Sequence, residues 1–227
     1  MIELFIDQYS SFSGNVDFLF DLITYIAGFW FLIAEGAIFY FLFRYRKKPG
    51  VKSEYVDGTN KRHKRWISIP HFLIIACDIV LIIGSAKVWY KIKQSLPEPD
   101  STIGIVSQQW AWTFIHPGKD GKLHTNDDIQ LIDELHIEVG KNYHYELTSK
   151  DTLHSFSVPT FRLKQDAVPG RKIRGWFKAD KKGVVDIQCA EMCGIGHGVM
   201  NARLFIHTKE EFRDWQQRQP RFSMTSP

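Results

Sequence analysis

The chain has 227 residues, enough for one large domain or two small ones. Its three cysteines are too few for a disulfide framework. The net charge of +4 arises within residues 1–96, which hold 12 Lys/Arg against 8 Asp/Glu, whereas residues 97–227 hold 17 of each. A nucleic-acid-binding domain would carry a basic patch, and nothing in this distribution indicates one.

The N-terminal part predicts two membrane-spanning helices. Residues 1–21 contain four acids and no Lys or Arg, unlike a typical signal peptide, which begins with a basic region. Residues 22–43 form an apolar run interrupted only by Glu35, and a helix needs about 20 such residues to cross a bilayer. A second apolar run covers residues 66–89. Residues 1–96 are therefore expected to form a transmembrane helical hairpin.

The loop between these runs sets the orientation. Residues 44–65 contain nine Lys/Arg, and by the positive-inside rule such a loop is cytoplasmic. Both chain ends and the C-terminal domain are then expected on the outer, periplasmic face. The topology allows a bacterial plasma membrane or a mitochondrial inner membrane, and we favour the bacterial one.

Residues 97–227 predict a β-rich domain outside the membrane. Segments rich in β-formers alternate with turn residues at 103–106, 134–139, 143–147, 173–177, 183–188 and 202–207. Several short strands at this spacing indicate a sandwich or a Greek-key barrel. A short helix is expected at residues 208–217, with Thr208 as its N-cap and acids in its first turn.

The most informative stretch is CAEMCGIGHGVM, residues 189–200. Cys189 and Cys193 are four residues apart, His197 follows four further on, and Met200 three beyond it. Thiolate and thioether ligands favour copper and imidazole suits it, whereas calcium and magnesium prefer oxygen. A single blue-copper site uses one cysteine and two histidines, so the second cysteine allows two thiolates to bridge two copper ions.

A copper pair would need a second histidine from elsewhere, and His154 is the best candidate. The thiol pair also has two interpretations without copper. Cysteines outside the cytoplasm often form a disulfide, and zinc accepts two Cys and two His. Neither uses Met200 together with His197 and Glu191, and zinc has little affinity for a thioether, so copper is favoured.

The ligand run C-x-E-x-C-x-x-x-H-x-x-M and the upstream segment His154-Ser155-Phe156-Ser157-Val158-Pro159 resemble subunit II of the haem-copper cytochrome c oxidases. That subunit carries the binuclear CuA centre. The resemblance implies a cupredoxin-like Greek-key barrel for residues 97–227. The metal ligands that it implies are His154, Cys189, the backbone carbonyl of Glu191, Cys193, His197 and Met200.

The resemblance also implies further roles. The Glu191 side chain would face a magnesium or manganese site at the interface with subunit I. Gln109-Trp110-Ala111-Trp112 matches the family's Q-W-x-W segment, which places Trp110 where an electron arrives from cytochrome c. Without the copper ligands, Trp110 would be better explained as a strand residue packing into the barrel. An acidic surface that steers cytochrome c is expected to include Asp127, Asp128, Asp133, Glu134 and Glu138.

The function implied is that of the electron-accepting subunit of a terminal respiratory oxidase. Its CuA centre would accept electrons from cytochrome c, soluble or membrane-attached, and pass them to haem in subunit I, where oxygen is reduced to water. Subunit I, other oxidase subunits and membrane lipid are the expected partners. The alternatives are a membrane-anchored copper-delivery protein for oxidase assembly, or a subunit of a quinol-fed oxidase, whose known relatives lack the copper ligands. His63 stands where the family often has a glutamate at the entrance of a proton channel. Either His63 substitutes for that glutamate or protons enter by another group.

Overall fold

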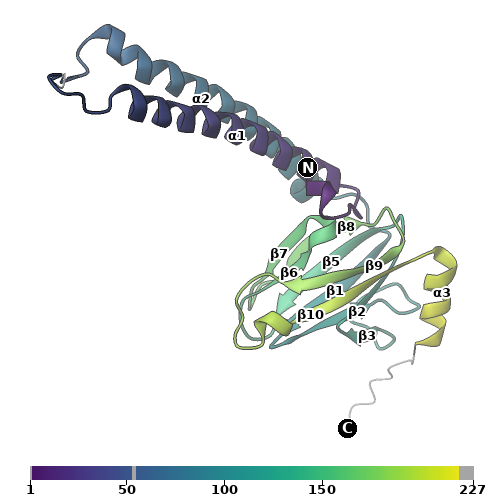
Figure 1. Ribbon diagram of the computed structural model, residues 1–227. Helices are drawn as coiled ribbons and strands as arrows, with labels where there is room; N and C mark the ends of the chain where they lie inside the picture. Colours follow the sequence, from purple (N-terminus) through teal and green to yellow (C-terminus); the bar gives the residue numbers. More distant parts are fainter. Residues whose placement is uncertain (1, 53–54, 220–227) are drawn as a thin grey trace. The chain divides into compact units, whose positions relative to one another are not determined.

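The computed structural model describes residues 2–52 and 55–219. These residues form two compact units (Figure 1). Residues 17–89 make up the first unit, and residues 2–16 together with the chain from residue 90 onward make up the second. The boundary predicted from the sequence, at residue 96, stays a prediction.

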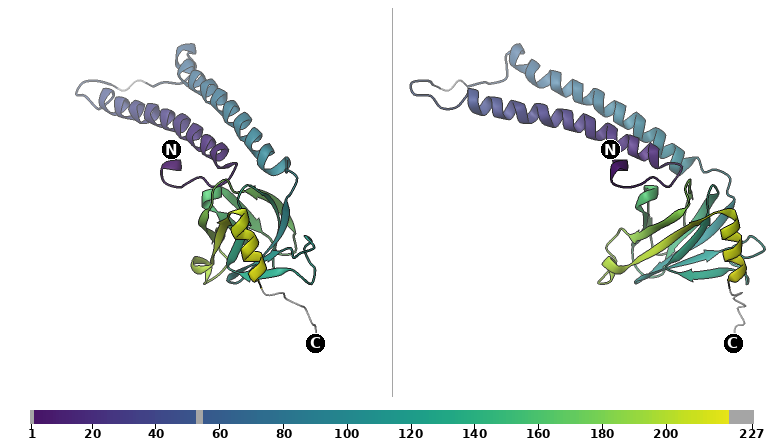
Figure 2. Two further views of the ribbon diagram at one scale, coloured as in Figure 1. Left: turned by 90° about the vertical axis from the view of Figure 1, so that its right-hand side faces the viewer. Right: turned by 45° about the vertical axis from the view of Figure 1, so that its right-hand side comes forward.

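The first unit is a helical hairpin of α1 (Ser13–Arg44) and α2 (Lys61–Trp89), which run side by side in opposite directions (Figures 1 and 2). Both helices are longer than the predicted spans, and their most apolar windows are not buried in this chain. A Cβ at Gly84 would lie 3.4 Å from Leu19 Cδ2, so glycine lets the helices approach closely there.

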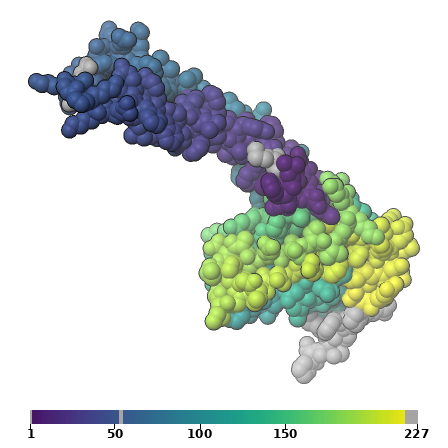
Figure 3. Space-filling view, viewed as in Figure 1, coloured from purple at the N-terminus to yellow at the C-terminus, as the bar shows by residue number. Residues whose placement is uncertain are grey.

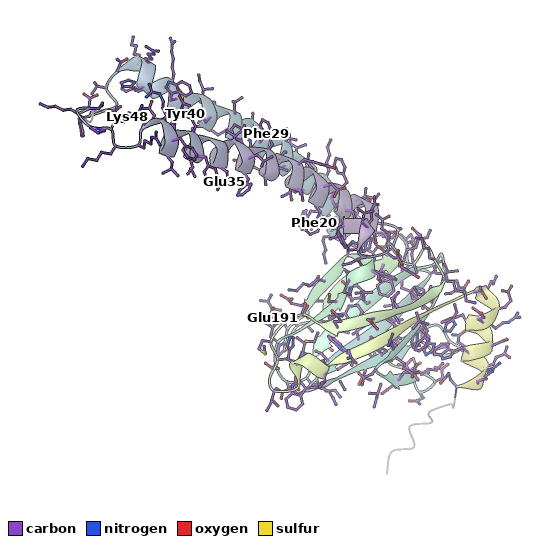
Figure 4. All side chains as sticks on the ribbon, viewed as in Figure 1. Phe20, Phe29, Glu35, Tyr40, Lys48 and Glu191 are labelled. Atoms are coloured by element: carbon purple, nitrogen blue, oxygen red, sulfur yellow. The ribbon has the colours of Figure 1, made fainter. Side chains whose placement is uncertain are left out.

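The middle stretches of both helices expose many large apolar side chains. Phe20, Phe29 and Tyr40 of α1 project outward, and Glu35 is an acidic side chain in the C-terminal half of that helix (Figure 4). A core helix of a water-soluble domain would bury this surface, whereas a bilayer solvates it. By length and composition, both helices are candidate membrane spans. Lys48 follows α1 in the basic loop.

The second unit is a sandwich of two five-stranded sheets, preceded by a π-helical turn at Tyr90–Gln94. The first sheet has the order β3-β2-β1-β5-β8, with bounds Ile129–Ile132, Ala111–His116, Ser101–Gln108, Asn142–Ser149 and Ile173–Lys178. The second sheet has the order β4-β10-β9-β6-β7, with bounds Glu134–Glu138, Asn201–His207, Gly183–Cys189, His154–Val158 and Leu163–Ala167. The cupredoxin-like fold expected from the sequence is confirmed.

Aromatic rings from both sheets fill the core of the sandwich. Phe156 on β6 lies 5.6 Å from Trp112 and 6.3 Å from Phe114, both on β2, and 6.2 Å from Tyr145 on β5, measured between ring centroids. All four side chains are fully buried. Burying a side chain of this size contributes roughly 1.5–3 kcal/mol, so the core holds the strands that carry the site below in a fixed frame.

The N-terminal segment belongs to the β-domain unit. After a 3-10 turn at Ile2–Leu4, Ser10 pairs with Ala179 in an isolated β-bridge, and its Oγ donates to Phe161 O in the 3-10 turn Pro159–Phe161. Phe12 is fully buried against Trp176. The sequence did not predict this packing. Its notable feature in this segment is the set of four acids, whereas Ser10 and Phe12 make the contacts with the β domain.

The chain ends in α3 (Lys209–Arg218), close to the predicted residues 208–217. Thr208 Oγ1 accepts from the Glu211 amide, and the Glu211 side chain accepts from the Thr208 amide. This capping box satisfies two amides that would otherwise lack helical partners. The predicted N-cap is confirmed.

Candidate metal centre

Adjacent strands bring the predicted ligands together. His154 begins β6 and Cys189 ends β9, and the two strands pair antiparallel, with Phe156 opposite Cys189. The other ligands lie on the loop between β9 and β10, which includes the 3-10 turn His197–Val199. This loop forms one edge of the β domain (Figure 3, yellow-green).

The side chains of the predicted ligand set converge around the two sulfur atoms. Cys189 Sγ lies 3.8 Å from Cys193 Sγ and 3.9 Å from His154 Nδ1. Cys193 Sγ lies 3.8 Å from His197 Nδ1 and 3.9 Å from Met200 Sδ. The carbonyl oxygen of Glu191 is 3.3 Å from Cys189 Sγ. Each sulfur therefore faces one imidazole nitrogen and one weaker donor.

This donor set fits copper. Both cysteines are free thiols and buried, so the structure does not form the disulfide considered from the sequence. The ligand atoms of His154, Cys189 and Cys193 lie within 4.8 Å of one another. Burial, reinforced by the neighbouring Cys189 thiol, raises the pKa of Cys193 to about 11. A cation that binds both sulfurs would displace these protons, as thiolate-binding metals do.

Asp151 orients His154. His154 Nε2 lies 2.8 Å from Asp151 Oδ1, a hydrogen bond that leaves Nδ1 directed at Cys189. Desolvation opposes ionisation of Asp151, but hydrogen bonds from His154, Gln109 and Thr152 outweigh it and lower the pKa of the carboxyl. A carboxylate behind a ligand histidine fixes its ring and raises its basicity. Sequence reasoning did not identify Asp151, although it lies three residues before His154.

His197 lies at the open side of the cluster. A surface cavity of about 460 Å³ is lined by His197, Met200, Asp186 and Arg203, among others. Arg203 and Asp186 form an ion pair of 2.8 Å across its wall. His154 is fully buried and His197 is not, so the two imidazoles differ in their access to solvent or to a partner.

The two tryptophans of the Gln109–Trp112 segment have different positions. Trp110 lies in the turn between β1 and β2 and is 38% exposed. Trp112 is the residue that packs into the sandwich, and its ring centroid is 6.3 Å from that of His154. The packing explanation considered for Trp110 therefore applies to Trp112 instead.

Glu191 contributes to the cluster through its backbone. Its side chain is partly exposed at the edge of the β domain (Figure 4), away from the buried thiols. The carbonyl, and not the carboxylate, approaches Cys189. The magnesium or manganese role of the carboxylate remains a proposal.

Two of the five acids expected on a docking surface face inward. Asp128 and Glu138 are buried, Asp128 accepting from the His124 amide and Glu138 paired with Lys141 at 2.9 Å. Their carboxylates are engaged in local contacts, which corrects the expectation that they steer a partner. Of the five, only Glu134 is an exposed residue, and its side chain is 55% exposed.

Comparison with known proteins gives a consistent assignment. The family model described as the periplasmic domain of cytochrome c oxidase subunit II matches residues 101–205. Cytochrome c oxidase subunit 2 of Thermostichus vulcanus is 30% identical over 97% of this chain and 80% of its own length. Alternative cytochrome c oxidase subunit 2 of Bradyrhizobium diazoefficiens is 29% identical over 92% of this chain and 82% of its own.

A solved structure agrees with the fold. The crystal structure of the periplasmic domain of subunit II of cytochrome oxidase from Bradyrhizobium japonicum superposes with a TM-score of 0.50 and 28% identity. The match covers 55% of this chain and 96% of that one. The match to the Thermostichus protein extends over nearly the whole chain, and the two apolar helices and the sandwich agree with the resemblance seen in the sequence. The chain therefore belongs to the cytochrome c oxidase subunit II family.

Proposed function

We propose that the chain is the electron-accepting subunit of a cytochrome c oxidase and that the cluster around Cys189 and Cys193 binds a binuclear CuA centre. The observation that carries the proposal is the pairing of donors, because each sulfur has its own imidazole and its own weak donor. A disulfide or a single-copper site would not need this duplicated set.

Each ligand has a distinct part in this proposal. The thiols of Cys189 and Cys193 and the imidazoles of His154 and His197 would be the main ligands of the two ions. Met200 and the Glu191 carbonyl would be the weaker ones. When bound, the copper pair would supply a one-electron relay between cytochrome c and the haem of subunit I, where oxygen would be reduced to water. The buried aromatic core excludes water behind His154 and limits rearrangement of the ligands.

The remaining chain places this centre in the complex. The helical hairpin of residues 1–96 anchors the chain in lipid beside subunit I and other oxidase subunits, and the β domain lies on the outer face of a bacterial plasma membrane. Trp110 is the residue at which the electron arrives, because it is exposed beside the ligand loop. The Glu191 carboxylate reaches a magnesium or manganese ion shared with subunit I.

The proposal is tested by mixing the full chain, purified in detergent and loaded with copper, with reduced cytochrome c. We expect cytochrome c to be oxidised in proportion to the bound copper, as followed by its absorbance. The same chain loaded with zinc provides a control without redox chemistry. A copper-loaded chain that leaves cytochrome c reduced but transfers its copper to an acceptor protein would support the copper-delivery alternative.

A further inference from the structure

We propose that Gly196 and Gln109 are positioning residues for Trp110. Gly196 supplies the surface on which the indole ring rests. Gln109, the residue before Trp110, ties the backbone at this point to the ligand loop. The role assigned to these residues rests on the proposed function, in which Trp110 receives the electron. The geometry itself does not depend on a bound metal.

The indole ring of Trp110 occupies the space that a side chain at Gly196 would need. A Cβ at Gly196 would lie 2.5 Å from Trp110 Cδ2 and 2.6 Å from Cγ, closer than real Cβ atoms approach. A Cβ at Gly194 would lie 3.2 Å from Trp110 Cζ2, and Gly194 also has φ +130°. The ring therefore lies against both Gly194 and Gly196, the two glycines between Cys193 and His197.

Gly198, in the same loop, has no such neighbour. A Cβ there would meet nothing within 4 Å among the residues that the structure describes. Two glycines two residues apart thus differ in whether the Trp110 ring covers them. This contrast separates the proposed role of Gly196 from a general need for flexibility in a glycine-rich loop.

Gln109 ties the residue next to it to two segments of the site through two hydrogen bonds. Its backbone N–H donates to Asp151 Oδ2 at 2.6 Å, and its side-chain Nε2 donates to the Cys193 carbonyl at 2.7 Å. Asp151 uses its other oxygen to accept from His154. Trp110 is therefore tied to the segments that carry Cys193 and His154, two of the proposed ligands.

These contacts fix the distance between Trp110 and the ligand cluster while leaving part of the ring accessible. Trp110 is 38% exposed, so a partner can approach one side of its ring while the other side rests on Gly196. Electron transfer slows as the distance between donor and acceptor grows, so a displaced Trp110 ring would slow transfer to the ligand cluster. The tether and the glycine surface would keep such displacement small.

The first experiment measures the position of the ring without metal or electron transfer. Hydroxyl-radical footprinting of the full chain in detergent, read by mass spectrometry, reports the oxidation of Trp110, with the buried Trp112 as reference in the same peptide. We expect Gly196→Ala to raise Trp110 oxidation relative to Trp112, because the added methyl group displaces the ring. Gly198→Ala is the matched control and should leave the ratio unchanged. Gln109→Leu, which removes the bond to Cys193 O without touching the glycine, should also raise it.

The second experiment measures the consequence for cytochrome c oxidation by the copper-loaded chain. We expect Gly196→Ala to slow oxidation severalfold, with unchanged copper content and copper spectrum. In a Trp110→Phe background the same substitution should cost much less, because the residue through which it acts is already altered.

An unchanged footprint in both Gly196→Ala and Gln109→Leu would overturn the inference whatever the function of the chain. A raised footprint with an unchanged rate would overturn the positioning role. If Trp110→Phe alone leaves the rate unchanged, the proposed arrival point of the electron is wrong, and the footprints still report separately whether Gly196 supports the ring.

Discussion

The loop between β9 and β10 and helix α3 lie at opposite ends of the β domain (Figures 1 and 2). The histidines beside this loop and those beside α3 differ in what faces their ring nitrogens. His154 and His197 each direct Nδ1 at a cysteine sulfur. His136 directs Nδ1 at another histidine, His207, at 2.8 Å. Soft sulfur atoms beside imidazoles make a metal site, whereas a second imidazole can simply share a proton.

Aromatic rings surround the second group, which we call the α3 histidine cluster: His116, His136 and His207. His136 stacks between Trp215 of α3 at 4.4 Å and Phe205 of β10 at 4.6 Å, and His116 meets Trp215 edge-on at 5.1 Å. Burial, with a small contribution from His136, lowers the pKa of His116 to about 3. Burial and His207 lower that of His136 to about 4.

The comparison shows that a buried histidine becomes a ligand only if its open nitrogen meets a suitable donor set. In the α3 histidine cluster the imidazoles act as neutral aromatic surfaces that hold α3 against the sheets. Their nearest charged groups are Glu134, 3.5 Å from His136, and Glu211 and Lys182, which shift the pKa of His207 in opposite directions. The α3 histidine cluster therefore serves stability, whereas under the proposed function the thiol cluster binds metal.

The largest effect is expected for Cys189→Ser. Loss of one bridging sulfur leaves the pair without its shared ligand, so the chain should lose the copper pair completely. Copper per chain, measured by atomic absorption after desalting, provides the test. Cys77→Ser, in α2, is the control and should retain copper; equal loss in both variants would show that the buried thiols are not the site.

Acid should destabilise the β domain through the α3 histidine cluster. The unfolded histidines bind protons near pH 6.5, whereas in the folded domain His116 and His136 bind them only near pH 3 and 4. The unfolded state therefore takes up more protons, and the free energy of unfolding should fall as pH falls from 6.5 toward 4, by about 1.4 kcal/mol per pH unit for each histidine.

Urea unfolding of the full chain in detergent, followed by tryptophan fluorescence at a series of pH values, measures this slope. His116→Leu should reduce it, because one of the titrating groups is removed. His124→Gln, at an exposed histidine outside the cluster, should not. A free energy of unfolding that stays constant between pH 6.5 and 4 would contradict the assignment of neutral histidines.

A smaller effect is expected for Asp151→Asn. The amide keeps an acceptor for the Gln109 N–H but removes the charge behind His154, and loss of such a supporting group typically weakens metal binding about 10-fold or more. Competition with a copper chelator measures the affinity. Asp180→Asn, at an exposed aspartate, is the control, and equal affinities in the two variants would remove Asp151 from the account.

The smallest effect is expected for Thr208→Ala. It removes one half of the capping box that begins α3, which should cost about 1 kcal/mol of stability. Thr208→Ser keeps the hydroxyl and should lose little. Urea unfolding at neutral pH compares the two, and equal losses would mean that the methyl group, and not the cap, matters.

The spacing of the cysteines, histidine and methionine in residues 189–200 predicted the ligand loop. Segments rich in β-formers predicted six of the strands. The other four strands, β2, β3, β6 and β7, were not predicted. For β6 and β7 the reason is that HSFSV and LKQDA lack continuous β-formers, and their pairing is set by β9 and by each other. Gln109 was noted only as part of a motif, since its partner Cys193 is 84 residues away. Contacts across the sandwich leave no periodic signal in the sequence.

The most direct test of the central claim is the copper content and electron paramagnetic resonance spectrum of the full chain, purified in detergent and loaded with copper. The account predicts two copper ions per chain and one unpaired electron shared equally by both nuclei. One copper per chain, or a spin localised on a single nucleus, would contradict the binuclear centre on which the proposed function rests.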